Sequence, residues 1–184
     1  MKILLLLILF LTLINATSFS QAKNRTFSFS KRAIGEIILR DSIQKIHYKL
    51  LDTSSNKDYL LNKYEITTGC EINVFHKNSS LILGFETCCE NVILENGIHV
   101  GSKLFDVTKF DTTFTLALGE EFGFIKYDKE NSCRILLLLG KECMEQFWDS
   151  YNRNPHQARM ENYLDRNWTI KKIKVISLGL AINN

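Results

Sequence analysis

The sequence predicts an α+β fold, in which an antiparallel sheet of hairpins packs against short helices. Segments 70–87 and 121–140 each place two apolar runs on either side of a polar turn, which is typical of a β-hairpin. Segment 144–151 instead repeats apolar residues at i, i+3, i+4 and i+7, which predicts an amphipathic helix. The apolar members of that helix are Met144, Phe147, Trp148 and Tyr151. Hairpins mixed with separate helices favour the α+β class.

The N-terminus has the features of a signal peptide. One lysine precedes an apolar run over 3–14, and Ser20 and Ala22 place small side chains where signal peptidase requires them. The run is too short to cross a bilayer of about 30 Å as a helix. We therefore expect cleavage after Ala22 and a soluble mature chain of residues 23–184, exported to the periplasm or secreted, without stable membrane insertion.

The first elements of the mature chain are expected to be short. The alternating stretch RTFSFSK, residues 25–31, predicts a strand, and a brief extended piece follows over 37–39. Asp41 with Gln44 has the capping-box spacing of a helix start. Helical spacing then predicts an apolar face made of Ile43, Ile46, Leu50 and Leu51.

The same pattern recurs when the chain is shifted by sixty-one residues. Ser102 takes the capping place of Asp41, and the hairpin over 121–140 corresponds to that over 70–87. We therefore expect one domain with a tandem repeat of a strand–helix–hairpin unit. The modules span about 33–90 and 94–140, although a chance resemblance between two common local patterns remains the alternative.

The end of the chain is predicted to differ from both modules. A helix–helix–strand extension is expected over 141–184, its second helix starting at the Asn154-Pro155 pair. The last strand alternates Ile173 and Val175 with lysines. The aromatic stripe Phe147-Trp148-Tyr151 could form a ligand platform, but at helical spacing it is more simply core.

Five cysteines follow the expected cleavage point, and export would permit disulfides. In the first hairpin Cys70 faces Cys88, or Cys89 after a one-residue adjustment. Cys133 and Cys143 are candidates for a second bridge. The odd number leaves one of the vicinal pair free, and we assign the free thiol to Cys89.

The composition and motifs exclude several function classes. The formal charge of +3 falls to about +2 without the leader, and its signs are interspersed, so nucleic acid is not an expected partner. The sequence has no phosphate-binding glycine loop, no G-x-S-x-G and no H-E-x-x-H motif. Its four histidines are scattered: His47, His76, His99 and His156. We therefore assign no catalytic, cofactor-binding or metal-binding residue and expect no cofactor.

The phrase GIHVGSKLFDV resembles the opening of small exported bacterial proteins of the SmpA/OmlA lipoprotein type and of the β-lactamase-inhibitor-protein-like fold. The residues that carry the likeness are Gly97, Ile98, Val100, Gly101 and Val107, with Ile37, Leu39 and Ile46 as a weaker first copy. The lipoproteins' lipid-bearing cysteine has no counterpart here. The resemblance implies an α+β fold whose sheet face binds another protein.

These observations predict a non-catalytic binding or inhibitor-type module that acts on another envelope or secreted protein. Two alternatives stay open at this point. One is a small thiol-dependent enzyme that uses Cys88 or Cys89, since an odd number of cysteines leaves one of them without a disulfide partner. The other is a carrier of a small apolar ligand held between helices and sheet.

Overall fold

A computed structural model describes residues 26–178, apart from 31, 57, 78–79, 120 and 156–158. The expected signal peptide, residues 1–22, lies outside this range. In the described part no helix is long and apolar enough to cross a membrane.

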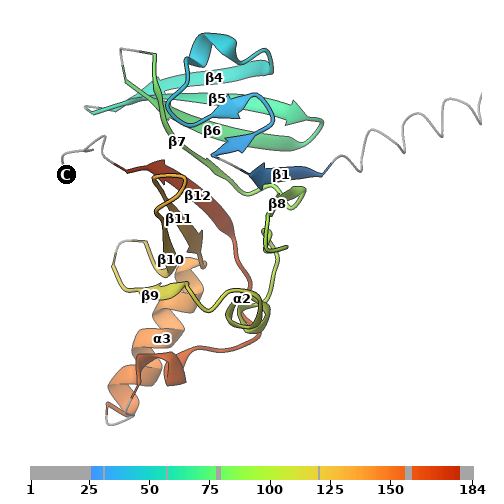
Figure 1. Cartoon of the computed structure of the whole chain (residues 1–184). Helices are drawn as coiled ribbons and strands as arrows, with labels where there is room; N and C mark the ends of the chain where they lie inside the picture. The colour runs from blue at the N-terminus through green and yellow to red at the C-terminus, as the bar shows by residue number, and fades with distance from the viewer. Residues whose placement is uncertain are drawn as a thin grey trace, which may run out of the picture.

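One large sheet dominates the fold, and every neighbouring strand pair in it is antiparallel. Its upper strands in Figure 1 run across the view, whereas β12 and β11 run downward, so the sheet is strongly twisted. In spatial order its strands are β4 (Lys49–Ser55), β5 (Leu60–Thr67), β6 (Cys70–His76), β7 (Ile82–Thr87), β12 (Lys172–Ser177), β11 (Cys133–Leu138), β10 (Gly123–Asp128) and β9 (Thr115–Ala117).

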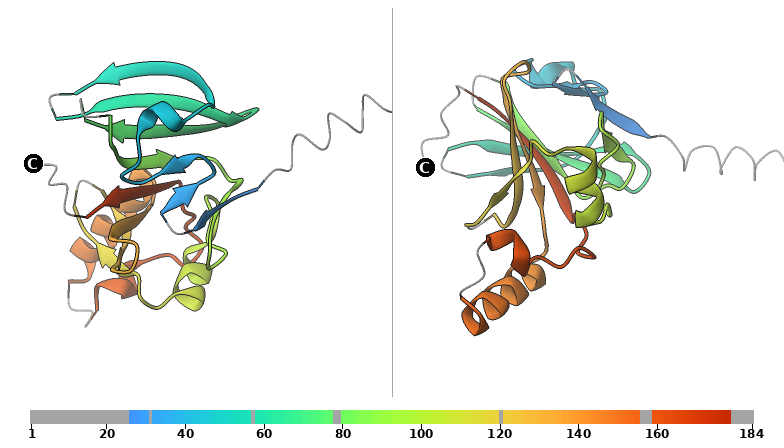
Figure 2. Two further views of the ribbon diagram at one scale, coloured as in Figure 1. Left: turned by 45° about the horizontal axis from the view of Figure 1, so that its top comes forward. Right: turned by 60° about the horizontal axis from the view of Figure 1, so that its bottom comes forward.

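A smaller sheet and four helical segments complete the described chain. The small sheet has the order β3 (Ile37–Ile38), β2 (Ala33–Ile34), β1 (Phe27–Ser30) and β8 (Val92–Leu94), and only its β1–β8 pair is parallel. Figure 2 shows the blue β1–β3 segment against the large sheet. The helical segments are η1 (Ile43–Lys45), α2 (Leu104–Phe110), α3 (Lys141–Arg153) and η2 (Met160–Tyr163), of which η1 and η2 are 3₁₀ turns.

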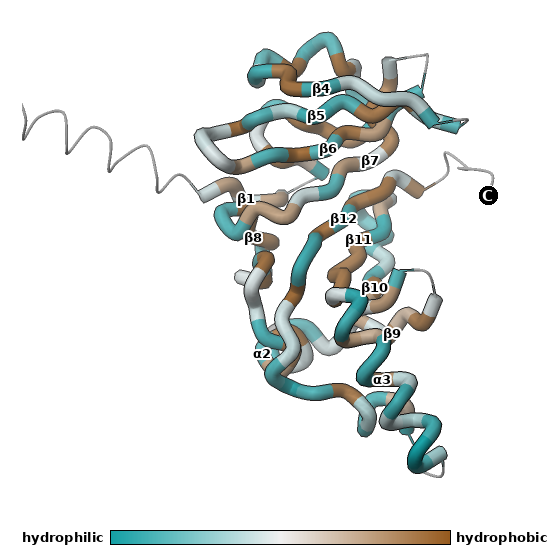
Figure 3. Tube along the Cα trace, turned by 180° about the vertical axis from the view of Figure 1, so that it is seen from behind, coloured by the Kyte–Doolittle hydropathy of each residue, from teal (hydrophilic) through white to brown (hydrophobic). Residues whose placement is uncertain are grey.

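The main core lies between one face of the large sheet and the elements that cover it. The small sheet contributes Phe29, α2 contributes Leu104 and α3 contributes Phe147, each at most 4% exposed. The sheet residues beneath them include Val74 and Ile173. Because α3 covers the core from outside, most of its tube in Figure 3 is hydrophilic, whereas the tube of the central strand β11 is mostly hydrophobic. The α+β class is therefore confirmed.

Most of the expected strands and the amphipathic helix are confirmed. Strands β1 and β3 match the expected pieces near 25–31 and 37–39, and β12 matches the last strand. The two hairpins correspond to β6–β7 and β10–β11. In α3, Phe147 is fully buried while Trp148 is 39% exposed, so the aromatic stripe is only partly core.

The helix predicted after Asp41 is wrong. Only the three-residue turn η1 forms there, capped by the Ser42 hydroxyl, and the chain is extended again at Ile46. Strand β4 follows at the edge of the large sheet, with Leu50 51% exposed. Its backbone hydrogen bonds go to β5, so tertiary pairing overrides a helical spacing that covered few residues.

Two further expectations about helices need correction. The second predicted helix does form, as α2, but its cap is Lys103; the Ser102 hydroxyl instead accepts from the His99 backbone N–H at 3.0 Å. The helix expected from Asn154 falls partly on undescribed residues. Its described part contains only the four-residue turn η2.

Candidate functional site

The large sheet has a second face that lies opposite the main core. Phe75, Leu136 and Ile176 are each less than 10% exposed, yet none belongs to the main core cluster. Their sequence neighbours Val74 and Val175 do belong to it. Successive side chains in a strand point to opposite faces. These three residues therefore lie on the other side of the sheet, which we call the open face.

Lysine–glutamate pairs surround the apolar residues of the open face. Lys174 pairs with Glu121, and its Nζ lies 5.7 Å from the centroid of the Phe75 ring. Lys172 Nζ lies 3.0 Å from Glu86 Oε1. Two of the three lysines of the stretch KKIK, Lys172 and Lys174 on β12, are therefore paired with glutamates. A face with a buried apolar centre and a charged rim can contact another protein through that rim and the exposed side chains beside it.

A hollow of about 300 Å³ lies on this face beside the end of β7. Alternation along β7 places Glu86 on the open side, while Thr87 points inward and is 3% exposed; Cys88, directly after β7, lines the hollow. Cys88 is an exposed free thiol. The other open-face residues that line the hollow are Lys63, Glu71, Asn73, Glu86 and Lys172, and we call it the Cys88 hollow.

The disulfide in the structure joins Cys70 to Cys89, so the assignment of the bridge to Cys88 and of the free thiol to Cys89 is wrong. The cause is a register shift in the hairpin. His76 faces Ile82 near the turn, but Phe75 faces Gly84, so Leu83 is an extra residue in β7. This bulge brings Cys89 opposite Cys70 on the core side, with 5.2 Å between their Cα atoms.

The expected bridge between Cys133 and Cys143 is not formed, and both residues are buried free thiols. Cys133 begins β11, whereas Cys143 lies in α3 beyond the other end of that strand. A strand rises about 3.3 Å per residue, so β11 holds the two cysteines too far apart for a disulfide. Burial raises the pKa of the Cys133 thiol to about 12, and the nearby Asp128 carboxylate adds to the effect.

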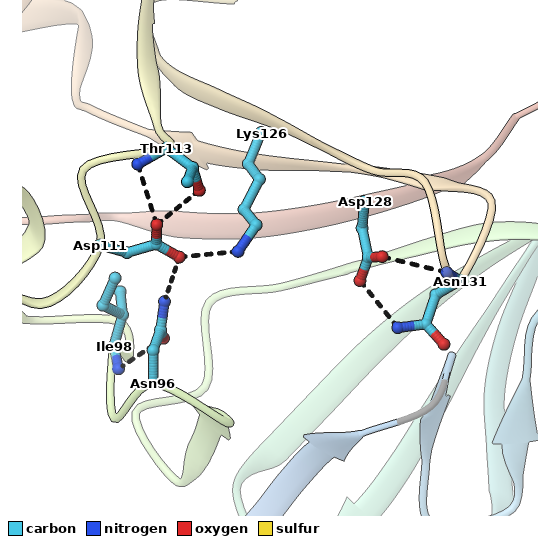
Figure 4. A network of polar contacts seen from close by, with 7 residues as sticks. All are labelled: Asn96, Ile98, Asp111, Thr113, Lys126, Asp128 and Asn131. Carbon is cyan, nitrogen blue, oxygen red and sulfur yellow. Dashed lines mark hydrogen bonds and ion pairs between the residues drawn. The ribbon is translucent and has the colours of Figure 1, made fainter.

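A polar network on the covered side of the sheet joins the end of α2 to β10 (Figure 4). Asp111 accepts hydrogen bonds from Lys126 at 2.8 Å and from Asn96 at 3.0 Å. It also accepts from the Thr113 backbone N–H at 3.0 Å and from its hydroxyl. Burial pushes the pKa of Asp111 upward, but these donors outweigh it and lower the pKa to about 2.

The network lines a second hollow of about 150 Å³. Asp128, on the opposite wall, accepts from the Asn131 backbone N–H at 3.0 Å and from its side-chain amide at 2.8 Å. The carboxylates of Asp111 and Asp128 thus both have donors within the chain, and their role is to hold loops. No sequence motif marked this network, because its members lie fifteen residues apart and meet only through the fold.

The histidines remain separate in the structure. His47 lies on the surface, 3.4 Å from Glu36, whereas Nδ1 of the buried His76 lies 3.1 Å from the backbone oxygen of Lys77 and its Nε2 has no hydrogen-bond partner among the described residues. His99 Nδ1 lies 2.7 Å from the Val100 carbonyl oxygen. His156 lies outside the described residues. Within the described ranges, no group of three or more histidine, cysteine or acidic side chains could hold a metal ion.

No family model and no curated protein matches this chain. One similar solved structure is the uncharacterized protein yfeY from Escherichia coli, at 13% identity and a TM-score of 0.42, covering 82% of this chain and 99% of that one. Another is an extracellular protein containing a SCP domain from Bacillus anthracis, at 8% identity and a TM-score of 0.39. That match covers 81% of this chain and 50% of the other.

Proposed function

We propose that this chain is an exported, non-catalytic binding or inhibitor-type module that holds another envelope or secreted protein on the open face of its large sheet. The observation that carries the proposal is the arrangement of that face. Its apolar centre at Phe75, Leu136 and Ile176 is set among lysine–glutamate pairs. Helices and the small sheet contribute to the core on the other side.

Export is part of this proposal. The leader pattern in residues 1–22 supports it, and so does the Cys70–Cys89 disulfide, since disulfides persist in oxidising compartments. The resemblance to β-lactamase-inhibitor-protein-like folds supports the use of a sheet face. The tandem repeat stays a prediction, in which α2 would correspond to the much shorter η1.

The alternatives differ in their support. A thiol-dependent activity would now rest on Cys88 alone, because Cys89 is in the disulfide. A carrier of an apolar ligand would rest on a hollow of about 280 Å³ whose lining includes Leu104, Phe124 and Leu164, since the hollows around Cys88 and Asp111 are lined by charged side chains.

The experiment that tests the binding proposal is cross-linking and capture of the tagged chain from its native host. Tyr127 is 57% exposed, and its pairing with Arg134 places it on the open face next to the Ile125–Leu136 pair. We expect one stoichiometric protein partner, whose recovery falls at least tenfold with Tyr127→Glu. Phe105→Glu is the matched control, because Phe105 is 48% exposed on α2 and outside the large sheet.

Two outcomes would contradict the proposal. One is a folded, intact chain that captures no stoichiometric protein. The other is a partner that is lost with Phe105→Glu and retained with Tyr127→Glu, which would move the binding surface away from the sheet.

A further inference from the structure

Arg134 of β11 lies on the open face, where it pairs with Ile176 of β12 on one side and with Tyr127 of β10 on the other. Directly opposite residues in an antiparallel sheet place their side chains on the same face. Ile176 is 8% exposed and Tyr127 is 57% exposed, and the Arg134 side chain between them is partly buried. Arg134 therefore lies at the margin of the apolar centre of this face.

The guanidinium of Arg134 has no partner among the residues that the structure describes. Its Nε is buried from solvent without a hydrogen bond, and no ion pair or ring contact engages the rest of the group in that part of the chain. The lysines of the neighbouring strand β12 differ, since Lys172 pairs with Glu86 and Lys174 pairs with Glu121. Buried donors almost always have an acceptor, and a charged donor without one is costly. Arg134 therefore marks a place where the open face lacks an acceptor.

The chemistry of the guanidinium defines the acceptor that fits. Asp128 follows Tyr127 in β10 but does not supply it, because Asp128 lines the hollow on the covered side and accepts two hydrogen bonds from Asn131. A guanidinium is always charged, and its planar pairs of N–H donors match the two oxygens of a carboxylate. A backbone carbonyl would accept one hydrogen bond and leave the charge uncompensated. The acceptor that fits is therefore the carboxylate of another molecule.

We propose that the protein held on the open face inserts an aspartate or glutamate side chain beside Tyr127, where its carboxylate pairs with Arg134. This inference rests on the proposed binding function and names the chemical group that the partner must present. Arginine and tyrosine are among the residue types that most often dominate the energy of an interface. The partner also excludes water from the ion pair, which strengthens it. Arg134 then selects an acidic partner on a face where Lys172 and Lys174 are neutralised within the chain.

The test repeats the cross-linking and capture experiment with the full tagged chain carrying Arg134→Gln, which removes the charge. We expect recovery of the stoichiometric partner to fall at least tenfold. Arg153→Gln is the matched control and should keep the wild-type recovery, because Arg153 ends α3, and its side chain is 81% exposed and paired with Asp149. The isolated Arg134→Gln chain should have a urea unfolding midpoint no lower than that of the wild type, since the variant removes an unpaired buried donor.

A second variant identifies the chemical group on the partner. Arg134→Lys keeps the positive charge and places a primary amine at this position. A carbodiimide then joins that amine to a carboxylate in direct contact with it, and an amide forms with loss of water. Mass spectrometry of the captured complex should find this amide between position 134 and an aspartate or glutamate of the partner. The wild-type chain is the control, because its guanidinium does not react in this way.

Three results would overturn this inference and leave the binding function standing. The first is a partner that Arg134→Gln recovers as well as the wild type does, while Tyr127→Glu loses it. The second is a captured complex in which the amine at position 134 joins no carboxylate of the partner. The third is a fall in recovery together with a lower urea midpoint, because Arg134 would then stabilise the fold and not the complex. Capture of no protein by the folded wild-type chain would instead overturn the proposed function, and this inference with it.

Discussion

The carboxylate of Asp111 lies 2.8 Å from Lys126 Nζ, and this ion pair connects the residue after α2 to strand β10. The Asp111 side chain is 11% exposed, so solvent screens the pair only weakly. Together with the donors from Asn96 and Thr113, it lowers the pKa of this carboxyl from 3.8 to about 2.

A pH dependence of stability follows from this shift. The folded chain holds the proton of Asp111 less tightly than the unfolded chain, so the contribution is present above about pH 4. It is lost as the pH falls toward 2, and it amounts to about 2 kcal/mol. Urea unfolding between pH 7 and pH 2.5 should show a steeper loss of stability in the wild type than in Asp111→Asn. Asp149→Asn, at an exposed α3 pair, should keep the wild-type slope.

The disulfide should contribute substantially to stability. Cys70 and Cys89 are separated by 19 residues, and closing a loop of that size restricts the unfolded chain by about 3 kcal/mol. We expect the Cys70→Ser/Cys89→Ser double variant to lose about that much free energy of unfolding in denaturant titrations. Cys88→Ser should unfold like the wild type and should keep the bridge in mass spectra. A bridge that disappears in Cys88→Ser would show that the pairing is wrong.

The hairpins show how far the sequence could be read. Two apolar runs around a polar turn correctly predicted both strands of β6–β7, because strands that are buried in a sheet need such runs. Near the turn His76 lies opposite Ile82. The bulge at Leu83 leaves no comparable mark, and one extra residue changed the partner of Cys70 from Cys88 to Cys89. Register therefore depended on packing beyond the hairpin.

The candidate sites were harder to predict than the strands. The open face is built from residues far apart in the chain, such as Phe75 and Ile176, and nothing local distinguishes them from core residues. Glu121 pairs with Lys174 across 53 positions, and no local pattern marks that pair. The start of the edge strand β4 was mistaken for a helix because four apolar positions fit helical spacing, although only Leu50 and Leu51 of them lie in β4. These features are consequences of tertiary structure, which local patterns do not encode.

The three free thiols should differ sharply in reactivity toward iodoacetamide. Burial raises the pKa of Cys133 to about 12, so its thiolate fraction at pH 8 is on the order of 1 in 10,000. Burial also raises the pKa of Cys143. We expect the native chain to be alkylated once, at Cys88, and the urea-unfolded chain to be alkylated three times. Peptide mapping that finds label at Cys133 before unfolding would contradict the buried environment.

Gly84 should be essential for joining the two parts of the large sheet. It follows the bulge at Leu83 in β7 and lies opposite Ile176 of β12. A Cβ atom placed there would be 2.5 Å from the backbone oxygen of Val175, and a backbone atom within a paired strand cannot move aside cheaply. Gly84→Ala must therefore separate β7 from β12 locally, which breaks ladder hydrogen bonds and disturbs the buried Phe85 and Val175.

We expect Gly84→Ala to lower the free energy of unfolding by about 2 to 3 kcal/mol, the range typical of overpacking in a close-packed interior. Gly119→Ala is the matched control, because no atom lies within 4 Å of the added Cβ and its effect should stay within about 0.5 kcal/mol. Urea titrations followed by tryptophan fluorescence and by far-UV circular dichroism measure both variants. If Gly84→Ala and Gly119→Ala were equally stable, β7 and β12 would not lie as close together as their register implies. The open face crosses the junction of these two strands, so it would then not be a rigid surface.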